Sequence, residues 1–122
     1  MMTFKQWEAE KSNFTGTLGY HKLHTLYLTD GAKAMAENLG CFWLFDNIEL
    51  YDFYVAKYKF LAIKVVSREN KAVIDFQDGN DKSLMLIPIP YTDLPEGEYK
   101  LFVQEGEING KIAPIAMLPE EY

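Results

Sequence analysis

The sequence predicts an α+β domain in which N-terminal helices pack on one face of an antiparallel β-meander of four to five strands. The main observation is a change in apolar periodicity near residue 58. Apolar residues recur every three or four positions before it and every second position after it. Composition agrees, because a chain of 122 residues with 48% hydrophobic and 25% charged residues is typical of one globular domain spanning residues 1–122.

The residues before position 58 predict three helices. The first covers residues 3–13, where apolar side chains recur at spacings of three and four. After an irregular stretch with a short extended piece at residues 26–28, Thr29-Asp30-Gly31 predicts a helix start, since Thr and Asp side chains accept hydrogen bonds from the free amides of a first turn. Gly40 ends this helix, and the third begins near Cys41.

The residues after position 58 predict consecutive strands joined by short turns. Turns are expected at residues 67–70 and 78–81, where Asp, Asn and Gly tolerate the backbone angles of a tight reversal. The last strand contains Pro114, and a proline inside a strand favours an edge position. The expected strands are residues 59–66, 72–76, 83–89, 99–104 and 112–118.

The charge balance argues against direct nucleic-acid binding. Twelve basic and 18 acidic residues give a net charge of -6, whereas binding to a phosphate backbone draws its affinity from Lys and Arg. Residues 88–122 hold two Lys against seven acids, a local charge of 2 − 7 = -5. This acidic end either faces another protein with a basic surface or forms a solvated rim. Its acids are Asp93, Glu96, Glu98, Glu105, Glu107, Glu120 and Glu121.

The expected compartment is the cytoplasm. A single cysteine cannot form an intramolecular disulfide, and the first residues lack the apolar core of a secretory signal. No apolar run approaches the roughly 18 residues that cross a bilayer, so no membrane contact is expected. The protein is expected to be a monomer, or a homodimer through the terminal edge strand.

Two clusters invite a metal-site interpretation. His21 and His24 can offer two nitrogens to a metal, but no third ligand follows at a familiar spacing, and surface roles are favoured. Asp75, Asp78 and Asp81 suggest a calcium loop, but placing Gly79 at the loop's glycine position leaves apolar residues at ligand positions. No metal site is therefore predicted.

Cys41 is a candidate nucleophile beside a helix start, although the apolar residues after it favour a buried structural thiol. Asp46 and Glu49 lie one helical turn apart, a spacing that fits acid–base work and a hydrated helix face equally well. The sequence contains no phosphate loop, nucleophile elbow or metalloprotease motif. No catalytic residue and no cofactor is assigned, and a non-enzymatic protein is favoured.

The aromatic content is high, with eight Tyr, eight Phe and two Trp. Tyr and Trp on a surface favour protein recognition, because they bury a large area at little cost in conformational entropy. Trp43, Tyr51 and Tyr54 form a candidate recognition patch; the alternative is that they fill the core.

Several short stretches resemble a family of small bacterial domains of unknown function, whose members occur in bacterial genomes and on mobile elements. The resemblance spans nearly the whole chain and supplies no activity. It implies only that Asp30, Trp43 and Asp46 are the residues to test first. The matching stretches are Phe14-Thr15-Gly16, Leu28-Thr29-Asp30-Gly31-Ala32-Lys33 with Ala36-Glu37, Trp43-Leu44 with Asp46, Asp78-Gly79, Tyr91-Thr92-Asp93-Leu94-Pro95 and Leu118-Pro119-Glu120-Glu121-Tyr122.

These observations predict a small accessory protein that acts by protein–protein contact, with Asp30, Trp43, Asp46, Tyr51 and Tyr54 as binding residues. In one variant it comes from a phage or plasmid and inhibits a nucleic-acid-binding enzyme through its acidic face. The alternative is a small enzyme or ligand-binding domain with a pocket at the helix–sheet junction, lined by Asp30 and Asp46.

Overall fold

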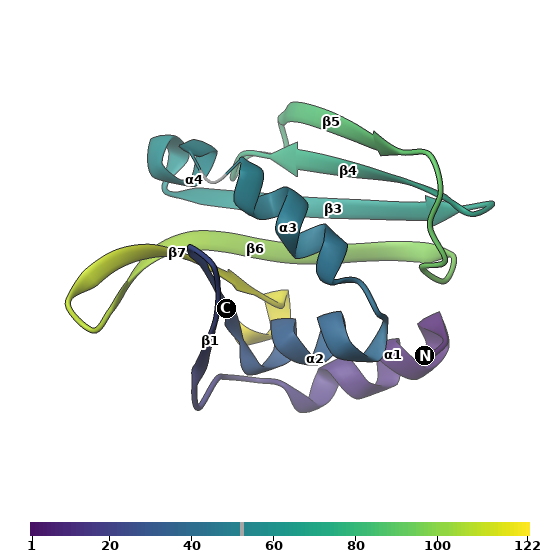
Figure 1. Ribbon diagram of the computed structural model, residues 1–122, viewed down its shortest axis with the longest axis horizontal. Helices are drawn as coiled ribbons and strands as arrows, with labels where there is room; N and C mark the ends of the chain where they lie inside the picture. The colour runs from purple at the N-terminus through teal and green to yellow at the C-terminus, as the bar shows by residue number, and fades with distance from the viewer. Residues whose placement is uncertain (52) are drawn as a thin grey trace.

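Four α-helices and seven β-strands make up the computed structural model, which describes residues 1–51 and 53–122 and only the backbone of residues 53 and 54 (Figure 1). The helices are α1 (Phe4–Glu10), α2 (Asp30–Asn38), α3 (Phe42–Leu50) and α4 (Phe53–Tyr58). The strands are β1 (Tyr20–Leu23), β2 (Leu26–Thr29), β3 (Phe60–Arg68), β4 (Lys71–Gln77), β5 (Ser83–Ile89), β6 (Gly97–Ile108) and β7 (Lys111–Met117). Short 3-10 turns follow α1 (η1, Lys11–Asn13) and β7 (η2, Pro119–Glu121).

The α+β class is confirmed, but the sheet is larger than predicted, and two of its strands, β1 and β2, lie before residue 58, where only helices and a short extended piece were expected. It has seven strands, in the order β1-β2-β7-β6-β3-β4-β5, rather than four or five. Pairing is antiparallel except between β2 and β7, which run parallel with Tyr27 opposite Ile115 and Leu28 opposite Ala116. The sheet is therefore mixed. It is not a simple meander either, because β6 lies beside β3 and not beside β5.

The prediction that the last strand is an edge strand is wrong. β7 lies inside the sheet, between β2 and β6, and the edges are β1 and β5. Pro114 is accommodated because β2 pairs only with Ile115 and Ala116, so the first half of β7 has β6 alone as a neighbour. A homodimer through β7 as an edge strand is therefore not the arrangement that this sheet order suggests, because β7 is an interior strand along Ile115 and Ala116.

One face of the sheet carries the core. Ile63 of β3 lies opposite Leu101 of β6 and Phe76 of β4, and all three side chains are fully buried. The predicted apolar stripe of the third helix, Cys41, Leu44, Phe45, Ile48 and Val55, is buried on the same core. This helix is divided, because α3 ends at Leu50 and α4 begins at Phe53.

Two tight turns carry backbone angles that favour small or polar residues. Glu69 and Asn70 have φ of 53° and 61° between β3 and β4, so the predicted turn is shorter than residues 67–70. Asn109 and Gly110, with φ of 52° and 80°, close the hairpin between β6 and β7. This hairpin extends β6 well beyond its predicted end.

No helix in the described part of the chain is long and apolar enough to span a membrane.

Candidate functional site

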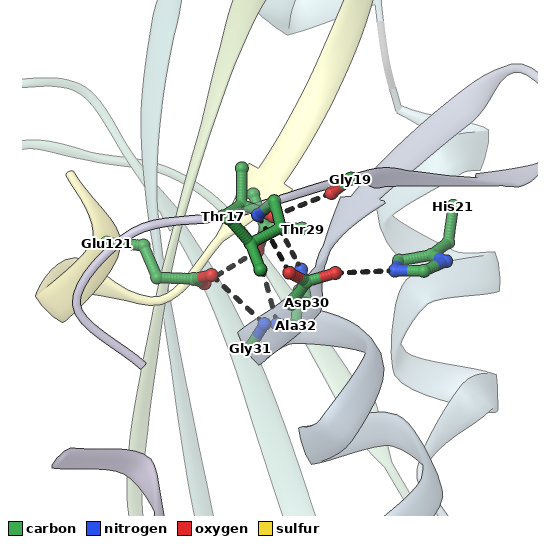
Figure 2. A network of polar contacts seen from close by, with 9 residues as sticks. Thr17, Gly19, His21, Thr29, Asp30, Gly31, Ala32 and Glu121 are labelled. Carbon is green, nitrogen blue, oxygen red and sulfur yellow. Dashed lines mark hydrogen bonds and ion pairs between the residues drawn. The ribbon is translucent and has the colours of Figure 1, made fainter. Parts of the chain in front are cut away.

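The start of α2 is held by its own N-cap side chain and by side chains from two distant segments (Figure 2). The Asp30 N–H donates to Thr17 Oγ1 (3.0 Å), the Gly31 N–H to Glu121 Oε2 (3.0 Å), and the Ala32 N–H to Thr29 Oγ1 (3.2 Å). Three amides that a helix start leaves without intrahelical partners are thus satisfied by side chains. This end of α2 offers no free amide in its first three residues for a bound anion.

Glu121 joins the C-terminal tail to α2. Its Oε1 accepts hydrogen bonds from the Thr29 hydroxyl (2.6 Å) and from the Leu118 N–H (2.9 Å), in addition to the Gly31 bond on Oε2. A Cβ atom at Gly31 would lie 2.5 Å from the Glu121 carboxylate, so only glycine lets the tail approach this closely. The contact spans 90 residues of sequence and fastens the last strand to the second helix.

Asp30 supports the segment that precedes β1. Its Oδ2 accepts from the Leu18 N–H (2.8 Å), and its Oδ1 lies 2.8 Å from His21 Nε2. The Leu18 amide and, next, the His21 side chain hold the pKa of Asp30 below its ordinary value. Both oxygens are used within the fold, so this predicted binding residue has a structural role.

Glu49 accepts backbone hydrogen bonds from the β1–β2 turn, as Asp30 does from the segment before β1. Its Oε2 accepts from the backbone amides of Thr25 (2.7 Å) and Leu26 (3.0 Å), and its Oε1 lies 3.0 Å from His24 Nδ1. Partial burial opposes ionisation, but the amides of Leu26 and Thr25 outweigh it and lower the pKa of Glu49. The two histidines therefore face different carboxylates, and no group of three metal-ligating side chains occurs among residues 1–51 and 53–122.

Cys41 is fully buried before α3, and its Sγ lies 3.6 Å from the Met35 carbonyl oxygen. Burial raises the pKa of the thiol to about 12. A thiol in this state is protonated at neutral pH and is shielded from solvent, as the structural interpretation predicted.

The Asp75, Asp78 and Asp81 cluster lies at the β4–β5 turn, where Asp78 Oδ1 accepts from the amides of Asn80 and Lys82.

A surface groove of about 340 Å³ lies between α3 and the connection from β5 to β6. We call it the Trp43 groove, and its lining residues are Trp43, Asn47, Ile89, Tyr91, Thr92 and Asp93. Trp43 is half-buried, whereas Tyr91 is 73% exposed. The Asn47 side-chain amide donates to the Trp43 carbonyl (2.8 Å), which fixes one wall. The groove thus has an aromatic side chain on each wall.

The β5–β6 connection is held firmly under the groove. Thr92 and Leu94 are buried, while Tyr91 before them and Asp93 between them are exposed. Exposed side chains on a loop anchored in this way are presented in a fixed position. The anchoring hydrogen bonds run from Thr92 N–H to the Asn70 carbonyl (2.9 Å), from Leu94 N–H to Thr92 Oγ1 (3.1 Å), from Ser67 Oγ to the Leu94 carbonyl (2.8 Å) and from the Tyr99 hydroxyl to the Pro95 carbonyl (2.7 Å).

Two carboxylates flank the groove. Asp93 lines it, and Asp46 lies one helical turn from Trp43 on the exposed side of α3. Neither forms a hydrogen bond or ion pair within the described residues. They differ in this respect from Asp30 and Glu49, whose oxygens are occupied.

The five predicted binding residues do not gather in one place. Trp43 lines the groove, Asp46 lies one helical turn from Trp43 on α3, and Asp30 lies at the start of α2. The Tyr51 ring packs edge-on against Phe76 in the core, with centroids 5.6 Å apart. The Tyr54 side chain lies outside the described residues. Neither Asp30 nor Asp46 lines the Trp43 groove.

A family model for DUF6876 matches residues 5–122, nearly the whole chain. The chain belongs to DUF6876, a family of unknown function. The resemblance noted in the sequence is thereby confirmed. No match was found among curated proteins or among solved structures.

Within this DUF6876 chain, the stretches that carry the resemblance meet at two places. Thr29-Asp30-Gly31 and the terminal Leu118-Pro119-Glu120-Glu121 meet in the network at the start of α2. Trp43 and the Tyr91-Thr92-Asp93 segment meet in the Trp43 groove. The contacts at the start of α2 stabilise the fold. The side chains at the Trp43 groove include exposed aromatic and acidic groups that form, among the described residues, no hydrogen bond or ion pair needed for the fold.

Tyr91 is a candidate site residue that the sequence did not single out, and Asp93 was named only as one acid of the acidic end. A signal was present, because both belong to one of the stretches noted for the resemblance. No local sequence pattern indicated that this stretch lies opposite Trp43, because Trp43 and Tyr91 are 48 positions apart in the sequence (91 − 43 = 48).

Proposed function

We propose that the protein is a non-enzymatic accessory protein that acts by contact with another protein through the Trp43 groove. The observation that carries the proposal is the combination of Trp43 and Tyr91 on opposite walls with two unengaged carboxylates, Asp46 and Asp93, beside them. Aromatic residues in a partly enclosed groove are typical centres of binding energy in protein interfaces. The anchored β5–β6 connection supports it, because a preformed groove loses little entropy on binding.

The partner that fits this chemistry presents a basic surface. An Arg or Lys side chain can lie over an aromatic ring, an attraction worth about 0.5–1 kcal/mol at exposed sites, and can pair with a carboxylate at the same time. Several carboxylates of the acidic C-terminal third are already paired within the chain, which favours a small binding site at the Trp43 groove over binding across a broad acidic surface. Glu98, Glu105 and Glu120 pair with Lys64, Lys59 and Lys11 of the chain itself.

The test is site-specific cross-linking in the native host. A photoreactive amino acid replaces Tyr91 in one variant and Ile112 in a control. These side chains are 73% and 66% exposed, and they lie in the β5–β6 connection and in β7 respectively. We expect a discrete adduct from position 91 only, which disappears when Asp46→Asn and Asp93→Asn are combined. The absence of an adduct at position 91, or the same adduct from both positions, would contradict the proposal.

A second candidate function, ligand binding, is favoured by one observation. A pocket of about 350 Å³ lies at the junction of α1, α2 and β6, where the sequence predicted a helix–sheet pocket, although its lining residues do not include Asp30 or Asp46.

A further inference from the structure

The sheet has a gap beside the first half of β6. β7 ends at Met117 opposite Phe102, so Gly97–Leu101 pairs with β3 on one side and with no strand on the other. The chain turns there into the C-terminal tail, while α1 approaches from below the sheet in the view of Figure 1. Phe4 of α1 packs so closely on Gly97 that a Cβ there would lie 2.3 Å from the ring. A strand position next to β6 is thus left without a strand.

The backbone along this gap has hydrogen-bonding groups to spare. In an antiparallel pair, alternate residues direct their N–H and C=O groups away from the partner strand. The Glu105 N–H bonds to the Lys59 carbonyl on the β3 side, so Tyr99 also faces β3, whereas the backbone groups of Glu98 and Lys100 face the gap. The hydrogen bonds of the described residues include none that uses the Glu98 and Lys100 groups from that side. The tail does not take them, because its amides bond within the tail, Glu121 N–H to Leu118 and Tyr122 N–H to Pro119.

The gap opens into a pocket of about 350 Å³, within the range of about 300–1,000 Å³ usual for ligand sites. Its floor is apolar and buried, with Trp7, Met35, Tyr99 and Leu118 each at most 3% exposed. Its mouth carries charges of both signs. A ligand with an apolar side chain and a charged end fits such a pocket.

The charges at the mouth are unequally engaged. Lys11 pairs with Glu8 (2.9 Å) and Glu120 (3.6 Å), and Glu98 pairs with Lys64 (3.0 Å). Lys100 lines the pocket and enters none of the ion pairs found among the described residues. The charged group at the mouth without an ion pair among the described residues is therefore the Lys100 ammonium, which suits a ligand with an anionic end.

We infer that this pocket binds the C-terminal end of an extended peptide. The peptide backbone adds to the open edge of β6, its terminal carboxylate pairs with the Lys100 ammonium, and its last side chain enters the pocket over Trp7 and Leu118. The site is separate from the Trp43 groove, with which it shares no lining residue; the inference rests on the second candidate function, ligand binding, and is independent of protein contact at the groove.

The test is a titration of the full ¹⁵N-labelled chain with acetylated tripeptides that end in Leu, Phe, Ala or Lys, each with a free carboxylate or as the C-terminal amide. We expect at least one free-carboxylate peptide to shift the amide signals of Glu98–Lys100 and the Trp7 indole signal, and its amide form to bind about fivefold more weakly or worse. Lys100→Gln is expected to weaken binding about fivefold, because it removes the cation. Lys111→Gln, an equal charge change on exposed β7, serves as the control and leaves binding unchanged.

Three outcomes would overturn the inference. The first is that no tripeptide shifts the signals of Glu98–Lys100 and Trp7. The second is equal binding of the carboxylate and amide forms, which removes the role of the chain end. The third is that Lys100→Gln binds as tightly as Lys111→Gln.

Discussion

Replacing Glu121 by alanine tests whether the C-terminal tail holds the fold together. The substitution removes three hydrogen bonds, from the Thr29 hydroxyl and from the amides of Gly31 and Leu118, at 2.6, 3.0 and 2.9 Å. Each such bond contributes about 1 kcal/mol net, and a carboxylate at a helix start adds about 0.5 kcal/mol. The Glu121 side chain is half-buried, so water replaces part of the lost hydrogen bonding in the variant. We therefore expect Glu121→Ala to lower the free energy of unfolding by about 2–3 kcal/mol.

The assay is equilibrium urea unfolding followed by circular dichroism, with Glu120→Ala as the matched control. Glu120 is exposed, and its one ion pair within residues 1–51 and 53–122 is with Lys11 at 3.6 Å, so its loss is expected to change stability by less than about 0.5 kcal/mol. Equal midpoints for the two variants would refute the role assigned to the tail.

Three further outcomes follow from the same geometry. Gly31→Ala is expected to lower stability in the wild-type chain and to lower it less in a Glu121→Ala background, since the new Cβ meets the Glu121 carboxylate; additive losses in a double-mutant cycle would contradict this. Cys41, whose pKa burial raises to about 12, is expected to resist a thiol reagent at pH 8 in native buffer and to react fully in urea; rapid native labelling would count against its burial. Asp30→Asn is expected to cost about 1 kcal/mol at neutral pH. Since the folded pKa of Asp30 lies below its ordinary 3.8, the wild-type advantage is present above pH 3.8 and is lost as the pH falls through the folded pKa; unfolding curves at descending pH that keep a constant gap would exclude this linkage.

The fold was predictable where the pattern is local. The alternation Leu61, Ile63, Val65 places one face of β3 in the core, and the start of α2 at Thr29 and Asp30 follows from their capping side chains. β1 escaped prediction because Tyr20–Leu23 is a short, partly exposed edge strand with two polar residues among its four. The β6–β7 hairpin was predictable in principle, since Asn109-Gly110 is a strong turn signal.

The remainder depends on contacts between distant segments. The parallel pairing of β2 with β7 and the bond from Glu121 to Gly31 join residues about 90 positions apart, and no local periodicity encodes either. The candidate site shows the same division. Trp43 and Asp46 could be selected from the sequence, but Tyr91 and Asp93 join them only because the β5–β6 connection returns to the side of α3.

The most direct test of the proposed function is the affinity for the partner captured at position 91, measured across a series of salt concentrations. The chains compared are the wild type, the Asp46→Asn, Asp93→Asn double variant, and Asp81→Asn, which removes an exposed carboxylate from the β4–β5 turn. We predict that at low salt the double variant binds about tenfold more weakly, with a flatter salt dependence, and that Asp81→Asn binds as the wild type does. Identical affinities and salt dependences for all three chains would contradict recognition of a basic partner at the Trp43 groove.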